Sequence, residues 1–212
     1  MITLAIDTST TRGSVAVLKQ GTLLFEEHFN ADRSHSSHLF ACLERALKTA
    51  PHCDQIAIGL GPGSYSGIRI AISAAIGIGA GMNAGLVGIA SNAAIETEAA
   101  HYQVIGDARR GTFYYAQIRD GICLEGPLLL SCDELKEKLA ANPALPVFTS
   151  DSLPDFPASI SAHPSAQKLA RLAEQGTGIH SVDNIEPIYL REPHITPGVK
   201  QKDGILNLHS GG

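Results

Sequence analysis

The sequence predicts a duplicated α/β fold, and two observations support this prediction. Short apolar strands alternate with helical segments along most of the 212 residues, which is the pattern of sheets covered by helices. A strand that ends at Ile6-Asp7 and a turn with Gly13 lead into a second strand. The same order recurs at Ile105-Gly106-Asp107 and Gly111. The match rests on two points, so it indicates a duplication without establishing one.

The composition excludes several classes of protein. Hydrophobic residues at 44% and charged residues at 17% exclude a wholly disordered chain. The net charge of −5 argues against a protein that binds nucleic acid by itself. The four cysteines form no CxxC pair, which favours reduced thiols over a zinc site. The first ten residues lack the pattern of a signal peptide, so we expect a cytoplasmic protein.

The first hundred residues predict one sheet and its helices. Apolar runs bounded by turn formers predict five strands, at residues 2–6, 14–18, 22–29, 55–60 and 86–89. The first three strands form an antiparallel meander. Helical spacing predicts one helix that Ser34 or Ser36 caps and that ends before Pro51, and another that runs from the glycine loop to about residue 80. Ser91 can cap a further helix to about residue 100.

The second half predicts a similar order of elements. Strands are expected at residues 103–105, 112–118, 122–125 and 146–149. Ser131 and Glu134 form a capping box for a helix that runs to about residue 141. Residues 165–175 predict a last helix, which Gly176 closes. An apolar patch follows at residues 188–190, and the polar end of the chain predicts a mobile tail.

Residues 70–90 contain no charged side chain and are long enough to span a bilayer. Five glycines dilute the apolar residues, and Asn83 interrupts them. The composition therefore favours a buried helix, turn and strand, and no membrane contact is expected.

The glycine loop Gly61-Pro62-Gly63-Ser64-Tyr65-Ser66-Gly67 is the most distinctive motif. A loop between a strand and a helix directs backbone N–H groups at an anion. However, Gly67 is followed by Ile68-Arg69 and not by the Lys-Ser/Thr of a Walker loop, and the glycines miss the GxGxxG spacing by one residue. Two interpretations stay open: a tight turn that docks the helix on the sheet, or an anion contact.

Two acidic turns are further candidates for a site. Asp7 with the hydroxyls of Thr8-Ser9-Thr10 can orient Mg²⁺ and phosphates, or it can satisfy the amides of its own turn. Asp107 leads into the partner loop. Arg109 and Arg110 there can clamp a phosphate, or they can fill the space that a phosphate would need. His35 and His38 lie three residues apart, but no nearby ligand completes a metal site.

Four segments together resemble the TsaB (YeaZ) family, the bacterial partners of the tRNA threonylcarbamoyladenosine synthase TsaD. They are LAIDTST, GLGPGSYSGIRIA, GDARRGTFYYA and IEPIYLRE. The resemblance implies a two-lobed fold of the actin, sugar kinase and Hsp70 class, with ribonuclease H-like lobes. We expect a first lobe at residues 1–100, which carries the dimerisation helices, a second lobe at residues 101–192, and the tail at residues 193–212.

The resemblance also implies a role. The chain is expected to be a non-catalytic scaffold that binds a TsaD-like subunit as a heterodimer, with a TsaE-like ATPase. The complex forms N6-threonylcarbamoyladenosine in the anticodon loop of ANN-decoding tRNAs. Contact with tRNA is expected through the complex, and the free chain is expected to form a homodimer. TsaD-type paralogues carry metal-binding histidines in a region that here, at residues 88–96, has none. No metal is therefore expected, and a glycoprotease label has no support.

The resemblance places any cofactor and the partner at two separate sites. No cofactor is expected to bind tightly, and at most weak ATP or ADP binding is expected in a degenerate cleft formed by Asp7, Ser9, Asp107 and Arg109. The partner is expected on the two helices of the first lobe, at Leu39, Leu43, Ile68, Ala71, Ile72, Ala75 and Gly79. The alternative is that these seven residues are core. The alternative function is a phosphotransferase or ATPase that acts through Asp7 and Asp107.

Overall fold

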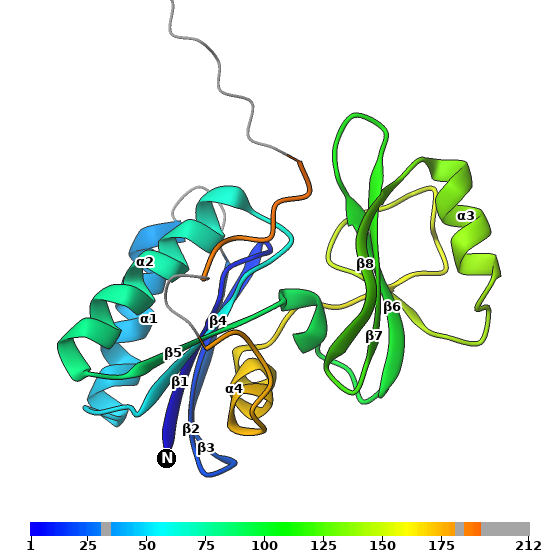
Figure 1. Cartoon of the computed structure of the whole chain (residues 1–212). Helices are drawn as coiled ribbons and strands as arrows, with labels where there is room; N and C mark the ends of the chain where they lie inside the picture. The colour runs from blue at the N-terminus through cyan, green and yellow to red at the C-terminus, as the bar shows by residue number, and fades with distance from the viewer. Residues whose placement is uncertain (31–34, 181–184, 192–212) are drawn as a thin grey trace, which may run out of the picture.

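A computed structural model describes residues 1–30, 35–180 and 185–191 and shows two lobes side by side (Figure 1). The expected cap at Ser34 and the expected mobile tail lie outside the described residues, and the side chain of Ser36 is not described either.

The first lobe is built on a five-stranded mixed sheet of order β3-β2-β1-β4-β5. The strands are β1 (Ile2–Asp7), β2 (Arg12–Lys19), β3 (Thr22–Asn30), β4 (Gln55–Gly59) and β5 (Gly85–Ile89). The first three form the expected antiparallel meander, and β4 and β5 continue the sheet in parallel with β1. Each strand lies within a few residues of its predicted range.

The second sheet has the order β10-β9-β6-β7-β8. Its strands are β6 (His101–Asp107), β7 (Phe113–Arg119), β8 (Ile122–Leu130), β9 (Val147–Thr149) and β10 (Ile160–Ser161). Three antiparallel strands are again followed by two parallel ones, so the topology repeats that of the first sheet. The predicted duplication is confirmed, and Asp7 and Asp107 end equivalent strands.

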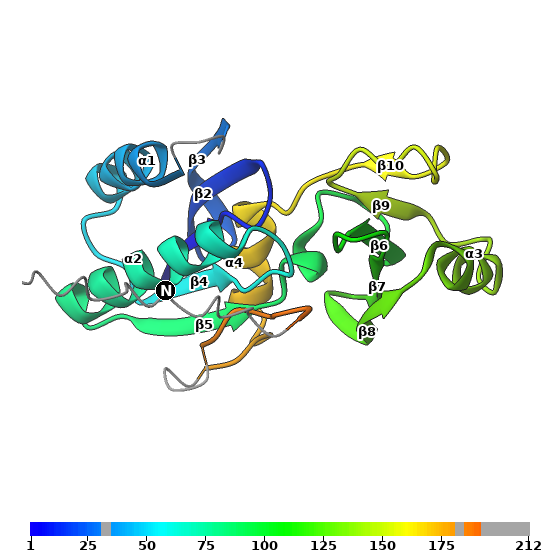
Figure 2. The ribbon, with the colours of Figure 1, turned by 90° about the horizontal axis from the view of Figure 1, so that it is seen from above.

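Helices cover both faces of the first sheet (Figure 2). On one face, α1 (His35–Thr49) and α2 (Tyr65–Met82) enclose a core with apolar residues of β1, β2 and β4. On the other face, α4 (Ala166–Glu174) packs its alanines and leucines against Ala5, Ala16 and Ala57. The small side chains of this face let the helix approach closely. In the second lobe, α3 (Cys132–Ala140) begins with the predicted capping box and covers a smaller core.

Two sequence predictions were wrong. The helix expected from Ser91 to residue 100 is a single 3-10 turn, Ser91–Ala94, because the Ser91 hydroxyl bonds to Asp7 and to the Gly61 amide and does not cap a helix. The chain then crosses to the second lobe, beside the returning segment at Pro164. The division at residue 100 assigned α4 to the second lobe, whereas α4 packs on the first sheet.

Helix α2 is the one described helix that is long and apolar enough to cross a membrane by length and composition. Its buried side instead packs on the first sheet, and it ends at Asn83, whose left-handed backbone leads into β5. Residues 70–90 thus form the helix, turn and strand that the sequence predicts.

Candidate functional site

A cleft of about 570 Å³ separates the two lobes. The turn after β1, the glycine loop, the β6–β7 turn and Leu190 line it. Ser9, Asp107 and Arg109 lie on its walls as predicted, whereas Asp7 does not. The structure therefore brings together three of the four residues expected in a degenerate nucleotide site.

Asp7 is fully buried and its carboxylate is already bonded within the lobe. Oδ1 accepts from the Ser9 amide at 2.9 Å and from the Ser9 hydroxyl at 2.7 Å, and Oδ2 accepts from the Ser91 hydroxyl at 2.7 Å. Burial raises the pKa of Asp7, against the opposing effect of these bonds. Asp7 thus accepts hydrogen bonds from Ser9 and Ser91 of its own lobe. This agrees with the second interpretation of the sequence, in which Asp7 satisfies its own turn and does not orient Mg²⁺.

The glycine loop packs on the turn that follows β1. The Ser64 amide donates to the Ser9 carbonyl at 2.6 Å, and the Thr8 hydroxyl donates to the Gly67 carbonyl at 2.8 Å. A Cβ atom on Gly63 would lie 2.0 Å from the Ser9 carbonyl oxygen, so a side chain cannot fit there. These contacts support the interpretation of a tight turn that docks α2, rather than an anion-binding loop.

The β6–β7 turn has a different shape. Arg109 and Arg110 both have a left-handed backbone, with φ of 67° and 57°. The Asp107 carboxylate accepts from the Arg109 amide at 2.7 Å, and the Asp151 carboxylate accepts from the Asp107 amide at 2.8 Å. The Arg109 side chain is 88% exposed at the rim of the cleft, where its guanidinium lies 3.6 Å from the Asp107 carboxylate.

The seven residues expected at the partner interface are buried inside the chain. Leu39, Leu43, Ile68, Ala71, Ile72 and Ala75 are at most 8% exposed, and Gly79 is also buried. They belong to the core between the first sheet and its two helices. The interface prediction was therefore wrong for these residues. Leu39 and Leu43 lie on the buried side of α1, and the other five occupy the side of α2 that faces the sheet, although α2 is apolar on two sides.

The opposite side of α2 is exposed and carries small and apolar side chains. Ile76 is 43% exposed, and Ser73, Gly77, Ala80 and Gly81 are exposed around it. A Cβ atom on Gly77 or Gly81 would meet no heavy atom of the described chain within 4 Å. No charged residue follows Arg69 in α2. We call Ser73, Ile76, Gly77, Ala80 and Gly81 the outer face of α2.

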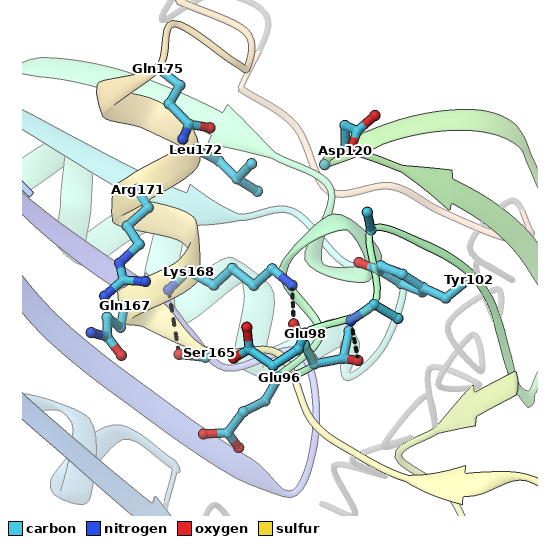
Figure 3. Close-up of a pocket in the computed structure, with 14 residues that line it drawn as sticks. Glu96, Glu98, Tyr102, Asp120, Ser165, Gln167, Lys168, Arg171, Leu172 and Gln175 are labelled. Atoms are coloured by element: carbon cyan, nitrogen blue, oxygen red, sulfur yellow. Dashed lines mark hydrogen bonds between the residues drawn. The ribbon is translucent and has the colours of Figure 1, made fainter. Parts of the chain in front are cut away.

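A second pocket, of about 510 Å³, lies between α4 and the crossover segment at residues 96–100 (Figure 3). Lys168 extends along it and donates to the carbonyls of Ile95 and Thr97, at 3.0 and 2.8 Å. Its amine lies 5.7 Å from the centre of the Tyr102 ring, and burial lowers its pKa. Lys168 thus ties α4 to the crossover segment. The periodicity of α4 shows which face is apolar but gives no sign of this bond.

Among the described residues, no group of three or more His, Cys, Asp or Glu side chains could hold a metal ion. The side chain of His35 is not described, so the histidine pair noted in the sequence is not tested.

Two lobes of repeated topology around a cleft define a protein of the actin-like class. In agreement, a crystal structure of a Pseudomonas aeruginosa protein described as similar to peptidase YeaZ superposes with a TM-score of 0.71. It is 25% identical and covers 90% of this chain and 99% of that one. YeaZ of the same organism has the same fold, with a TM-score of 0.66.

Sequence comparisons agree with this structural similarity. Residues 29–129 match the TsaD family model, described as tRNA N6-adenosine threonylcarbamoyltransferase. A Mycobacterium tuberculosis protein described as uncharacterized is 28% identical over 92% of this chain and 93% of its own length. The Escherichia coli tRNA threonylcarbamoyladenosine biosynthesis protein TsaB is 32% identical over 54% of this chain and 53% of its own length. In sequence and in fold, the chain is therefore similar to proteins of the TsaB (YeaZ) family.

Proposed function

We propose that the chain is a non-catalytic subunit that binds a TsaD-type synthase during the formation of threonylcarbamoyladenosine in tRNA. The observation that carries this proposal is the outer face of α2, which is uncharged, consists of small and apolar residues, and is exposed in the described chain. Small residues at four-residue spacing let a second helix approach closely. Its occupant is a helix of the TsaD-type subunit.

The cleft supports a role outside catalysis. A phosphotransferase of this class would need a carboxylate that faces the substrate, and the Asp7 carboxylate is buried and bonded to Ser9 and Ser91. Asp107 remains at the cleft but holds the Arg109 amide. These contacts favour the subunit over the alternative phosphotransferase or ATPase, and at most weak ATP or ADP binding is proposed, with no tightly bound cofactor.

The remaining features of the proposal come from the family. A TsaE-like ATPase completes the assembly, tRNA of the ANN-decoding class is contacted through the complex, and the chain acts in the cytoplasm. Without its partner, the chain pairs with a second copy through the outer face of α2.

A matched pair of arginine substitutions tests the docking face. Gly77→Arg adds a charge to the outer face of α2, and Ala140→Arg adds the same charge to an exposed helical position on α3. Both variants should remain folded. We expect Gly77→Arg to weaken binding to the TsaD-type protein at least about tenfold, since a charge would be buried at the contact. Ala140→Arg should bind as the wild type does.

Titration calorimetry and size-exclusion chromatography measure the two associations. The Gly77→Arg chain should also elute as a monomer where the wild type elutes as a dimer. Unchanged affinity of Gly77→Arg for the TsaD-type protein would refute the docking face. ATP turnover by the isolated wild type that Asp7→Asn abolishes would instead favour the phosphotransferase.

A further inference from the structure

Residues 185–191 form an extended segment, here called the strap, that runs from the first lobe to the mouth of the cleft (Figure 1). Its first half is fixed to the first lobe. Ile185 is 6% exposed in the core under α1 and α2, and the Ile188 amide donates to the Leu60 carbonyl at 2.8 Å.

The middle of the strap covers the start of α2. The Tyr189 ring lies 5.5 Å from the Tyr65 ring, between centroids, and the Arg69 guanidinium lies 5.2 Å from the centroid of Tyr65. The next residue, Leu190, lines the cleft and packs on the core cluster that extends from α4 into the second sheet. The strap thus leaves the first lobe at Tyr189 and forms part of the cleft at Leu190.

The strap ends on the second lobe. Arg191 Nη2 donates to the Thr112 hydroxyl at 2.5 Å, and that hydroxyl donates in turn to the Arg109 carbonyl at 2.9 Å. Thr112 therefore links the strap to the turn that displays Arg109 at the rim of the cleft. On the other side of the molecule from the strap, the β7–β8 turn rests on α4, where a Cβ atom on Gly121 would lie 2.3 Å from Leu172.

We infer that the strap is a latch across the cleft mouth, with Leu190 and the Arg191–Thr112 bond holding the two lobes at their present separation. Two crossover segments, residues 95–100 and 162–165, join the lobes on the side of α4. Rotation about them widens the mouth and must separate Arg191 from Thr112. The latch therefore sets how readily a ligand from solvent enters the cleft. This inference does not depend on the proposed docking of a TsaD-type subunit.

Hydrogen exchange of the full-length chain tests the latch. Arg191→Ala and Thr112→Val each remove the Arg191–Thr112 bond, and Thr112→Val also removes the bond from Thr112 to the Arg109 carbonyl. We expect exchange of the amides in residues 95–100 and of Ala162, His163 and Ser165 to rise roughly fivefold in each single variant, and the double variant to exchange no faster than Thr112→Val. Thr112→Ser keeps the hydroxyl and should exchange as the wild type does.

Arg110→Ala is the matched control, because Arg110 lies in the same exposed turn, carries the same charge and has no side-chain partner among the described residues. It should leave the exchange unchanged. Wild-type exchange in both Arg191→Ala and Thr112→Val would overturn the latch, and so would additive effects in the double variant or an equal effect of Arg110→Ala.

Discussion

Gly77 and Gly79 lie two positions apart on α2 and face different surroundings. A Cβ atom placed on Gly77 meets no described heavy atom within 4 Å, whereas one placed on Gly79 lies 2.9 Å from Leu86 Cδ2 and 3.3 Å from the Ala84 carbonyl oxygen. Gly77 therefore lies on the exposed side of α2, and Gly79 lies on the side that packs against the rest of the lobe.

This difference predicts opposite responses to alanine. Gly77→Ala should raise the free energy of unfolding by roughly 0.5–1 kcal/mol, because alanine restricts the unfolded chain and meets no obstacle in the folded one. Gly79→Ala should lose this gain, since its methyl group displaces Leu86. Urea denaturation measures both, and equal stabilisation by the two changes would contradict the assigned orientation of α2.

Arginine at two alanines of α2 tests which side of the helix is core. Ala75 is fully buried, so Ala75→Arg should cost roughly 4 kcal/mol or more and abolish the cooperative unfolding transition. Ala80 is exposed on the outer face, so Ala80→Arg should fold normally. Circular dichroism during heating distinguishes the two. A folded Ala75→Arg chain would mean that this position is not core.

The buried Asp7 predicts a pH dependence of stability. Because burial raises its pKa above the ordinary value of 3.8, the folded chain keeps this proton to a higher pH than the unfolded chain. The stability contributed by Asp7 is therefore full below pH 3.8 and is lost as the pH rises through the raised pKa. Relative to the wild type, Asp7→Asn should become progressively more stable over that interval. Denaturation at a series of pH values measures the difference, and a constant difference would contradict it.

His163 predicts a dependence of the opposite sign. It lies in the returning crossover segment, and its Nδ1 atom is 2.9 Å from the Thr10 hydroxyl. Burial, together with the charge of Arg12, lowers its pKa, although Asp151, Glu96 and Asp7 oppose the shift. The unfolded chain therefore binds this proton first as the pH falls below 6.5.

Stability that depends on neutral His163 should thus be lost between pH 6.5 and the lowered pKa. His163→Gln keeps a hydrogen-bonding side chain beside Thr10 but cannot ionise, so it should flatten the profile in that interval. NMR titration of the imidazole gives an independent check, and a pKa of 6.5 or above in the folded chain would refute the prediction.

Local patterns predicted every described strand except the two-residue β10, together with the capping box of α3 and the duplication, because each depends on residues close together in the chain. The packed side of α2 was not predictable in this way. Residues on both sides of that helix are small or apolar, so periodicity does not show which side meets the sheet. Likewise, Ser91 has the residue type of a helix cap, and its bond to Asp7 joins positions 84 residues apart.

The same limit applies to the cleft. The sequence identified Ser9, Asp107 and Arg109 as residues of the cleft. For Asp7 it left open a role in binding Mg²⁺ and a role in its own turn, and the complete burial of Asp7 favours the second. Lys168 and the strap were missed as functional elements, because their partners Thr97 and Thr112 belong to distant segments.

The position of α4 makes the second lobe an insertion within the first. During synthesis, β1 to β5 emerge long before α4, so a nascent chain that ends near residue 160 leaves Ala5, Ala16, Leu18 and Ala57 facing water. The second sheet, in contrast, is contiguous in the chain and is complete at β10. The first lobe is therefore synthesised first but completed last. Truncation before residue 166 should leave a stable second sheet, attached to a first sheet that lacks α4 and is prone to aggregate.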